Sequence, residues 1–404
     1  MQDLNDLQIK FAKGASKTAL VAALGLMAMA PVHAQKIQSC IGASGPLTGA
    51  AAFGGESIRM GAEIAIEEIN AKGGVLGQKL SLKLYDDAGQ PPKGVDNVRR
   101  IALSDNCIAM LGGYHSGVQL AMRDPINQVG IPYVGTTAGG TGIIEHENGQ
   151  NTWMFRVSAK DKWVAQFLVE QAVARTKNKK VALLYENTGW GNGGVPDVEA
   201  AMKAKGLTLA AKETFNWNDV DMTPQLIRVR AAGVDTVIFW ALDREGNQIL
   251  RGMDKIGWRP ANMIAAWGLA GNLGEIAGKL ANGVMVFQTY TWMGKLEPRA
   301  DVIWKKIQTK YGLTTPEQIR MGSAVANSYD AVYIIAQAIE KAGSFDRSKV
   351  REAMYQVRYD GLVAKYEPAF ERNQERHDAI LPKYYKLTAW HEGKLLPLAE
   401  TPYK

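Results

Sequence analysis

Apolar and polar positions follow two alternating patterns along most of this chain. Short apolar runs, such as residues 37–43 and 181–185, predict buried β-strands. Longer segments place apolar residues three or four positions apart, as Ile58, Ala62 and Ile66 do, and these segments predict helices with one buried face. Strands and helices that alternate along a chain form a parallel sheet with helices on both faces. The pattern therefore predicts an α/β fold.

The alternation runs in two series, the second of which starts at residue 181. Strands are expected at residues 37–43, 80–85, 108–111 and 132–134, then at 181–185, 207–213, 234–240, 263–266 and 283–287, with strand-like pieces at 384–390 and 394–398. Helices are expected at residues 57–70, 92–103, 117–129, 195–205, 222–232, 245–256, 299–311 and 321–342. A chain of 404 residues has room for about two domains. Each series is therefore interpreted as one α/β lobe.

The first 34 residues differ from the rest of the chain. They contain three lysines, an uninterrupted apolar run at residues 19–30, and then Pro31 and the tripeptide Val-His-Ala, which ends at Ala34. This order is typical of a secretory signal peptide, residues 1–34, that is cleaved after Ala34. A membrane anchor is the alternative, but a spanning helix needs about 20 apolar residues. Cys40 lies too far beyond the apolar run for a lipoprotein, so a secreted and soluble mature protein is expected.

Charge and histidine content exclude several classes of function. The formal net charge is +7, and it becomes +6 once the three lysines and two aspartates of residues 1–34 are removed. No block of Lys and Arg accompanies this mild excess, so nucleic acid is not an expected partner. The four later histidines, His115, His146, His377 and His391, include no pair at metal-ligand spacing. No metal and no cofactor is therefore expected.

Two cysteines remain beyond the signal peptide, at matching depth in two predicted strands. Cys40 begins the run Cys-Ile-Gly-Ala-Ser-Gly, and Cys107 begins Cys-Ile-Ala-Met-Leu-Gly. An oxidising compartment permits a disulfide between them if the strands are neighbours. Bridges across adjacent strands are geometrically awkward. The sequence therefore leaves a Cys40–Cys107 disulfide and two buried thiols as alternatives.

Three glycine-rich loops follow predicted strands of the first series. Ligands of open parallel sheets bind beyond the carboxyl ends of the strands, so these loops are candidate site segments. Residues 42–49 lack the glycine spacing of a dinucleotide loop and are interpreted as part of a small-molecule pocket. Residues 112–117 open a helix whose free N–H groups, together with the Ser116 hydroxyl, suit a carboxylate. Residues 135–141 offer threonine hydroxyls and close backbone approach at glycines.

Catalysis is not favoured at these loops. Ser116 would be the nucleophile of a G-x-S-x-G elbow, but it falls one place too late in that frame and no Asp–His partner is evident. A plain helix cap is the other alternative to an anion site. Asp86 and Asp87 are adjacent, so they point to opposite sides of an extended chain and are interpreted as a structural loop. The sequence therefore predicts a protein that is not an enzyme.

Three tryptophans stand at or just after strand ends of the second series. Trp190 lies in the glycine-rich segment 185–192, which is interpreted as an exposed loop, and Trp240 and Trp267 end apparent strands. An exposed indole is costly unless it covers something apolar. The three indoles therefore predict an aromatic wall of the pocket, with ordinary core packing as the alternative.

Several of these segments together resemble the branched-chain amino-acid (Leu/Ile/Val) binding family of type I periplasmic binding proteins. The matching residues are Gly45-Pro-Leu-Thr-Gly49, residues 65–77 (Ala-Ile-Glu-Glu-Ile-Asn-Ala-Lys-Gly-Gly-Val-Leu-Gly), Tyr85-Asp-Asp-Ala88, Ile131-Pro-Tyr-Val134 and Phe155-Arg-Val157. Their order and spacing agree with the family from about residue 36 to 340. The resemblance implies two doubly wound parallel-sheet lobes, joined by a three-stranded hinge that closes on ligand.

The resemblance also implies the role and the organisation of the chain. Lobe 1 is expected to comprise residues 35–158 plus about 289–377, and lobe 2 residues 159–288 plus about 378–404. The role is that of a periplasmic, monomeric solute-binding protein that hands a small ligand to a membrane-embedded ABC permease. A sensor that presents ligand to a receptor is an alternative of another class.

Residue roles follow from the same resemblance. The helix that opens at Ser116 and Gly117 is expected to hold the ligand carboxylate, and Asp161 follows the first crossover between lobes. Together, the candidate ligand-binding residues are His115, Ser116, Gly117, Thr137, Ala138, Gly139, Asp161, Trp190, Trp240, Trp267 and Phe53.

One position departs from the family pattern. Members that bind amino acids use an acidic residue to pair with the ligand ammonium, and Trp267 stands at that position here. A buried ammonium without a counter-charge is strongly disfavoured. An aromatic or aliphatic carboxylate is therefore favoured as ligand over an amino acid, unless Asp161, Glu186 or Asp243 supplies the charge.

Overall fold

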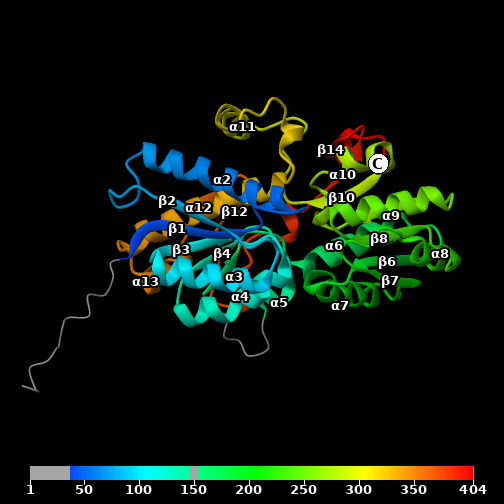
Figure 1. Cartoon of the computed structure of the whole chain (residues 1–404), viewed down its shortest axis with the longest axis horizontal. Helices are drawn as coiled ribbons and strands as arrows, with labels where there is room; N and C mark the ends of the chain where they lie inside the picture. The colour runs from blue at the N-terminus through cyan, green and yellow to red at the C-terminus, as the bar shows by residue number, and fades with distance from the viewer. Residues whose placement is uncertain (1–36, 146–152, 404) are drawn as a thin grey trace, which may run out of the picture. The chain divides into compact units, whose positions relative to one another are not determined.

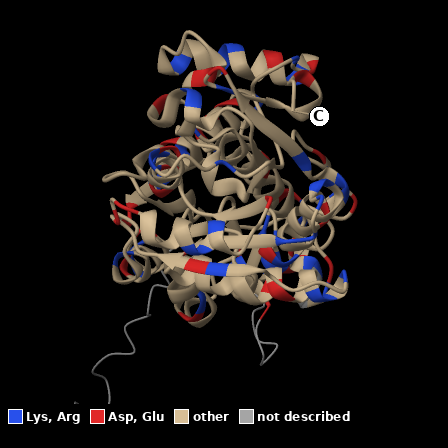
Figure 2. Ribbon diagram, turned by 90° about the vertical axis from the view of Figure 1, so that its right-hand side faces the viewer, with Lys and Arg blue, Asp and Glu red and all other residues tan. Residues whose placement is uncertain are grey.

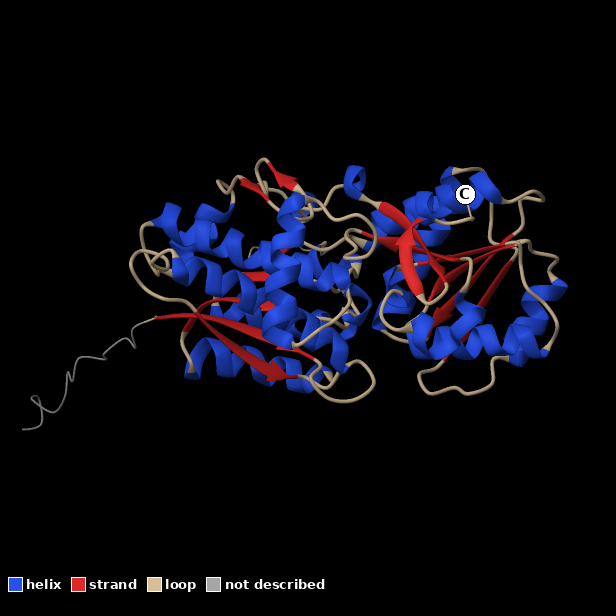
Figure 3. Ribbon diagram, turned by 90° about the horizontal axis from the view of Figure 1, so that it is seen from above, coloured by secondary structure: helices blue, strands red, loops and turns tan. Residues whose placement is uncertain are grey.

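A computed structural model describes residues 37–145 and 153–403, so the predicted signal peptide (1–34) and His146 lie outside the described residues. Two large sheets organise the described chain (Figure 1). One has five strands in the order β2-β1-β3-β4-β5, and the other has seven in the order β14-β13-β10-β9-β8-β6-β7. Helices cover both faces of each sheet (Figure 3). The predicted α/β class with two sheet-centred lobes is confirmed.

The five-stranded sheet is parallel throughout. Its strands are β1 (Gln38–Gly45), β2 (Ser81–Asp86), β3 (Cys107–Gly112), β4 (Tyr133–Gly135) and β5 (Met154–Arg156). Its helices are α2 (Ala52–Ala71), α3 (Pro91–Arg99), α4 (Ser116–Val129), α5 (Thr141–Ile144) and, from later in the chain, α12 (Gly322–Ala342). Every residue of the inner strand β3 is buried, whereas the edge strand β2 alternates with exposed positions. This is why β3 is an unbroken apolar run.

Helices α2 and α12 pack together on one face of this sheet, and α3 and α4 pack on the other (Figure 1). The closest approach of α2 to α12 is at Gly61. A Cβ atom added to Gly61 would lie 2.0 Å from the carbonyl oxygen of Val325. Only glycine therefore allows the two backbones to meet at this depth.

The seven-stranded sheet is mixed. Parallel strands β6 (Val181–Glu186), β7 (Ala211–Phe215), β8 (Thr236–Trp240), β9 (Asn262–Ala265) and β10 (Val284–Gln288) are joined by the antiparallel strands β13 (Lys386–His391) and β14 (Lys394–Pro397). Its helices are α6 (Asp161–Arg175), α7 (Gly189–Ala204), α8 (Thr223–Ala231), α9 (Asp243–Lys255) and α10 (Leu273–Ala277). The two antiparallel strands lie at one edge of an otherwise parallel sheet, and the chain forms them after it has returned from the first sheet.

The chain passes between the two sheets three times: after β5, after β10 and before β13. Between the last two passages lie α11 (Pro298–Tyr311), α12, α13 (Arg347–Met354) and the two-stranded pair of β11 (Tyr359–Asp360) and β12 (Lys365–Tyr366). Helix α12 contacts β3 and α13, which places this segment with the first sheet. The exact lobe boundaries within these passages stay a prediction.

A buried ion cluster links the first passage, after β5, to the third passage, before β13. Asp378 pairs with Arg156 in an isolated parallel bridge, and the Arg156 Nε lies 2.5 Å from the Asp378 Oδ1. The Nζ of Lys160 lies 3.0 Å from the other carboxylate oxygen of Asp378 and 2.8 Å from Glu145. The side chains of Arg156, Lys160 and Asp378 have no exposed surface.

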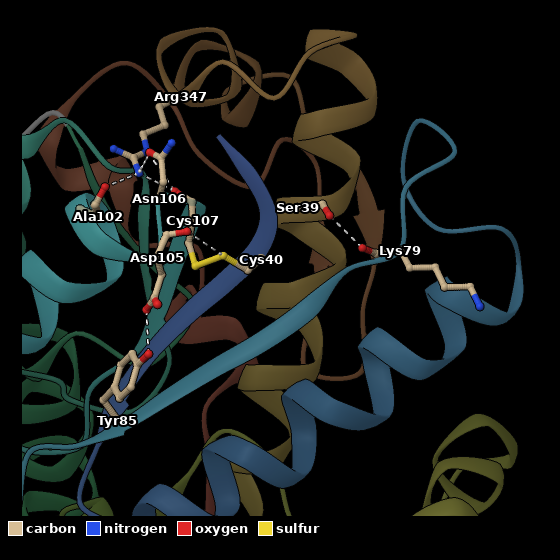
Figure 4. Close-up of a disulfide and its surroundings, with 9 residues drawn as sticks. All are labelled: Ser39, Cys40, Lys79, Tyr85, Ala102, Asp105, Asn106, Cys107 and Arg347. Atoms are coloured by element: carbon tan, nitrogen blue, oxygen red, sulfur yellow. Dashed lines mark hydrogen bonds between the residues drawn. A yellow bond between two sulfur atoms is a disulfide. The ribbon is translucent and has the colours of Figure 1, made fainter. Parts of the chain in front are cut away.

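The sulfurs of Cys40 and Cys107 are bonded, at 2.02 Å, and their Cα atoms are 4.7 Å apart (Figure 4). Strands β1 and β3 are neighbours, and their pairing changes register between Gln38 and Ile41, at the bridge itself. The two cysteines therefore do not occupy regular opposite positions, and this removes the geometric objection to a bridge between adjacent strands. Arg347 donates to the Cys107 carbonyl beside the disulfide at 2.7 Å.

Lysine and arginine are interspersed with aspartate and glutamate over the ribbon (Figure 2). Within residues 37–145 and 153–403, no helix is long and apolar enough to cross a membrane. No group of three or more His, Cys, Asp or Glu side chains in the same part of the chain is arranged to hold a metal ion.

Candidate functional site

Two adjoining cavities lie where strand ends of both sheets meet. The smaller, called the head chamber, has a volume of about 180 Å³, and the larger, called the outer chamber, has about 360 Å³. The two chambers share five lining residues: Gly89, Tyr114, His115, Trp217 and Leu242. Segments from both sheets supply the walls. The site therefore lies in a cleft between the two lobes, at the strand ends that the sequence indicated.

Ser116 and Gly117 begin α4 and line the head chamber. No side chain caps this helix, so its first N–H groups face the chamber with the positive end of the helix dipole. The Ser116 Oγ accepts a hydrogen bond from the Gly140 N–H at 3.2 Å. Gly117 meets the second lobe directly, since a Cβ atom added to Gly189 would lie 3.1 Å from the Gly117 Cα. The helix start thus combines anion-binding character with contact across the cleft.

His115 stands just before α4, between two aromatic rings. Its ring centroid is 4.9 Å from that of Tyr114 and 5.3 Å from that of Trp217. Burial lowers the pKa of His115 to about 4, so the imidazole is neutral at pH 7. His115 therefore contributes a flat, uncharged wall between the two chambers.

Thr137, Ala138 and Gly139 lie behind the head chamber and do not line either cavity. The Ala138 carbonyl accepts a hydrogen bond from the Ser158 hydroxyl at 3.2 Å. Gly139 is pressed against Asp161, because a Cβ atom there would lie 2.3 Å from a carboxylate oxygen. This loop therefore positions Ser116, through Gly140, and Asp161.

Asp161 begins α6 and is wholly buried beneath the indoles. Neither carboxylate oxygen accepts a hydrogen bond of good geometry among the described residues, although the indoles of Trp190 and Trp267 lie near enough to favour the ionised form. Burial raises the pKa of Asp161 to about 8, and the nearby Arg156 opposes this only in part. Asp161 is therefore a neutral acid at pH 7, next to two indoles that make no well-formed hydrogen bond to it.

The three predicted tryptophans form one group. The ring centroid of Trp190 is 4.6 Å from that of Trp267 and 5.7 Å from that of Trp240. Trp190 and Trp267 line the head chamber, whereas Trp240 lines neither chamber and supports Trp190 from behind. The aromatic wall therefore consists of two indoles that line the chamber and one indole that packs behind them.

The expected exposed loop around Trp190 is corrected. Helix α7 begins at Gly189 instead of residue 195, and Trp190 in its first turn is only 4% exposed. The Thr188 hydroxyl caps this turn by accepting from the N–H groups of Trp190 and Gly191, at 3.2 and 3.3 Å. Gly191 is needed because a Cβ atom there would lie 1.8 Å from the Glu186 carbonyl oxygen. Glycines that indicated a loop are thus required for close packing inside a helix.

Phe53 lies in the first turn of α2 and lines the outer chamber. Its ring meets that of Tyr114 edge to face at a centroid distance of 5.9 Å. The neighbouring loop is held by Asp86, which accepts hydrogen bonds from the Thr48 hydroxyl at 2.6 Å and the Leu47 N–H at 2.8 Å. The Asp-Asp segment therefore shapes the chamber wall and does not face its interior.

Sequence analysis did not single out Trp217 or Tyr114, and it named Glu186 and Asp243 only as possible partners for a ligand ammonium. Trp217 and Tyr114 line both chambers, and Glu186 lines the head chamber, where it accepts from the Trp217 Nε1 at 3.1 Å. Asp243 lines the outer chamber and accepts from the Gly271 N–H at 3.1 Å. Trp217 lies two residues after the end of strand β7, and this position was a usable signal. Burial raises the pKa of Glu186 and of Asp243 to about 7 in each case.

The arrangement is suited to binding a small molecule. The hydrogen bond recorded for the Ser116 hydroxyl is to a backbone N–H, and His115, the histidine beside it, packs against aromatic rings. A nucleophile needs a base within hydrogen-bond reach. The chambers instead offer a helix start, indoles and buried acids, which together can enclose a small polar-headed molecule.

Comparisons with known proteins agree with this geometry. A periplasmic binding protein family model matches residues 40–384. A Leu/Ile/Val-binding protein homologue of Brucella melitensis is 28% identical over 361 residues, which cover 89% of this chain and 93% of the relative.

Two solved structures show the same fold. A branched-chain amino acid transporter substrate binding protein of Streptococcus pneumoniae in complex with isoleucine has a TM-score of 0.75, with 19% identity and coverage of 88% of this chain and 97% of the other. A solute binding protein of an ABC transporter from Rhodopseudomonas palustris, in complex with 3,4-dihydroxybenzoic acid, has a TM-score of 0.74, with 18% identity and coverage of 89% and 96%. The chain therefore belongs to the periplasmic binding protein family with the type I fold, which confirms the resemblance to its Leu/Ile/Val-binding members.

Proposed function

We propose that this chain is the periplasmic solute-binding component of an ABC importer and that it captures a small carboxylate with an aromatic or aliphatic body. The observation that carries the proposal is the head chamber, in which the uncapped start of α4 faces Trp190 and Trp267. The helix start and the Ser116 hydroxyl suit the carboxylate. The indoles supply a large apolar contact for the body of the ligand.

The indole of Trp267 disfavours an amino acid as the main ligand. Trp267 is 6% exposed and lines the head chamber where an ammonium would need a counter-charge. Glu186 is already bonded to Thr188 and Trp217, and Asp243 to backbone N–H groups. An aromatic carboxylate is also the ligand in the related Rhodopseudomonas palustris complex.

An amino acid is the second candidate, and Asp161 is the observation that favours it. Its carboxylate is buried, lacks a hydrogen bond of good geometry among the described residues, and lies against the loop that supports Ser116. A ligand ammonium would ionise Asp161 and pair with it. The Streptococcus pneumoniae relative holds isoleucine.

Closure of the two lobes on the ligand is part of the proposal, and Thr141 would stabilise the closed form. Thr141, in α5 of the first lobe, donates to the Asp197 Oδ2 of α7 at 2.7 Å. The same hydroxyl accepts from the N–H of Lys162 at 2.9 Å. Both partners belong to the second lobe, so these bonds would form only on closure.

Replacing Thr141 by valine is expected to weaken ligand binding about tenfold. The substitution keeps the shape and removes a hydrogen bond to a half-buried carboxylate, and a hydrogen bond to a charged group contributes about 1.5–3 kcal/mol. Isothermal titration would measure the effect. The matched control is Thr309→Val, because Thr309 donates only to the Lys305 carbonyl on an exposed helix surface. Equal dissociation constants for Thr141→Val and the unchanged protein would contradict the role of Thr141 in closure.

Secretion, a monomeric state and delivery to a membrane-embedded ABC permease complete the proposal. They are supported by the family and by the composition of residues 1–34. A sensor that presents ligand to a receptor would share the same cleft, and import of the bound solute by the intact transporter would distinguish the two roles.

The test is a thermal-shift screen of refolded, ligand-free protein against amino acids and against aryl and short-chain carboxylates. A ligand that binds only the native state raises the melting temperature. A shift with carboxylates alone is expected. A shift with leucine, isoleucine or valine alone would replace the first candidate by the second, and no shift with either class would contradict the proposed function.

A further inference from the structure

The cleft does not end at the head chamber. Beyond the shared residues, the outer chamber adds about 360 Å³, twice the volume of the head chamber. We propose that the ligand is an elongated monocarboxylate whose far end occupies the outer chamber and carries a hydrogen-bond donor such as a hydroxyl. This inference rests on the proposed function, because it takes the carboxylate to be at the start of α4.

The volumes favour a long ligand. Binding proteins of this kind bury most of the ligand surface in a closed pocket. A branched-chain amino acid or a benzoate held at Ser116 would occupy the head chamber and leave the outer chamber to water. Apolar residues that line the outer chamber would then face water and make no contact with the ligand.

The passage between the chambers suits a flat apolar body. Tyr114, His115 and Trp217 line both cavities, and His115 is neutral. Farther out, the walls include Phe53 and Ile276. A ring or an extended chain that leaves the head chamber would therefore meet aromatic faces and then aliphatic surface, which favours stacking and apolar contact.

Two buried acidic residues line the outer chamber. Asp243 is 3% exposed, Glu245 is 4% exposed, and both line this chamber. Arg244 is the cation that lines it, and its guanidinium already donates to the side-chain oxygen of Asn218. A second carboxylate on the ligand would meet like charges, so a dicarboxylate is disfavoured.

The buried hydroxyl of Tyr114 independently favours a ligand that carries a hydroxyl group. Tyr114 is wholly buried, lines both chambers, and its hydroxyl has no hydrogen-bond partner among the described residues. The carboxylates of Asp243 and Glu186 lie close enough to raise its pKa further beyond the effect of burial. An unpaired buried hydroxyl is costly. A hydroxyl on the part of the ligand that enters the outer chamber would pair with the Tyr114 hydroxyl and donate onward to Asp243, which lines the same chamber.

The experiment uses ligand-free full-length mature protein and four carboxylates in isothermal titration. Benzoate fits the head chamber alone, and 3-phenylpropanoate extends beyond it. Its 4-hydroxy derivative adds a donor at the far end, and its 4-carboxy derivative adds an anion there. Affinity is expected to rise at least tenfold from benzoate to 3-phenylpropanoate, to rise again with the hydroxyl, and to fall at least tenfold with the second carboxylate.

Two variants locate the effects. Ala51→Phe narrows the outer chamber, so it is expected to weaken binding of the two longer monocarboxylates at least tenfold and to leave benzoate unchanged. The matched control is Ala71→Phe, at the exposed far end of the same helix. Tyr114→Phe is expected to remove only the advantage of the hydroxyl, which a double-mutant cycle measures as an interaction energy.

These measurements test the elongated ligand separately from solute binding itself. If benzoate binds as tightly as the longer acids and Ala51→Phe affects neither, the ligand is confined to the head chamber and the inference is wrong, while solute binding stands. Tight binding of leucine with no affinity for the longer acids overturns the inference in the same way. If neither the carboxylates nor amino acids bind, the proposed function itself fails.

Discussion

Replacing Asp378 by alanine is expected to lower the free energy of unfolding by about 3–5 kcal/mol, because it leaves buried cations without their partner. Asp378 contacts the Nε of Arg156 through one carboxylate oxygen and the Nζ of Lys160 through the other. Neither cation has exposed surface. Glu145 remains as a partner for Lys160, whereas Arg156 keeps only carbonyl oxygens, such as that of Gly140 at 2.9 Å.

Urea denaturation followed by circular dichroism would measure the loss. The matched control is Asp301→Ala, since Asp301 pairs with Lys305 on the surface and both side chains are largely exposed. That change is expected to cost less than about 1 kcal/mol. Asp378→Asn keeps the shape and removes the charge, so it separates electrostatics from packing. A loss at Asp378 no larger than the loss at Asp301 would contradict the role assigned to the cluster.

The position of the cluster connects stability to the cleft. Arg156 ends β5, and its guanidinium also donates to the carbonyl oxygens of Ala138 and Gly140, at 3.4 and 2.9 Å. Gly140 in turn donates to the Ser116 hydroxyl. Two of the three passages between the sheets are thus bonded to the loop that supports the head chamber. A change in the relative angle of the lobes would therefore act on the ligand site through these residues.

The inner strands of both sheets were predictable because they are buried on both sides. Every residue of β3, β8 and β10 is buried, and each is an apolar run that no helix pattern explains. Helix α6 was not expected. Its buried residues Val164 and Leu168 face the core, but Trp163 and Phe167 also pack against it, so the helix lacks a clear polar side.

The residues of the head chamber could be predicted in part from the sequence, whereas those of the outer chamber could not. The strand-end rule led to Ser116 and to Trp267, because both follow strands in the sequence. Which residues face them across the cleft depends on how the lobes meet. The contact of His115 with Trp217 joins residues from different lobes, and no local pattern indicates that pair. Gly189 is likewise required by contact with Gly117, although its sequence resembles a loop.

Binding affinity is expected to change with pH in a direction that identifies the ligand class, and Asp161 is the residue responsible. Burial raises its pKa to about 8, so it is neutral at pH 7. A bound carboxylate at the start of α4 disfavours ionisation of Asp161 through like-charge repulsion. Binding above pH 8 then requires proton uptake, and the affinity falls by up to about tenfold per pH unit.

An amino-acid ligand reverses the sign of this pH dependence. Its ammonium stabilises the ionised form of Asp161, so binding below pH 8 releases a proton and the affinity rises with pH until about pH 8. Asp161→Asn removes the titration and keeps the shape. Glu186 and Asp243 have pKa values of about 7 and titrate in both proteins, so the difference between the two pH profiles isolates Asp161.

Isothermal titration between pH 6 and pH 9.5, with one carboxylate or one amino acid that binds, would measure both profiles. Since we favour a carboxylate, the affinity of the unchanged protein is expected to fall above pH 8 relative to that of Asp161→Asn. Profiles that coincide would mean that the ligand head lies too far from Asp161 to sense its charge. The carboxylate would then have to bind away from the loop that joins Gly139 to Ser116, and the head chamber could not be the site of the charged end.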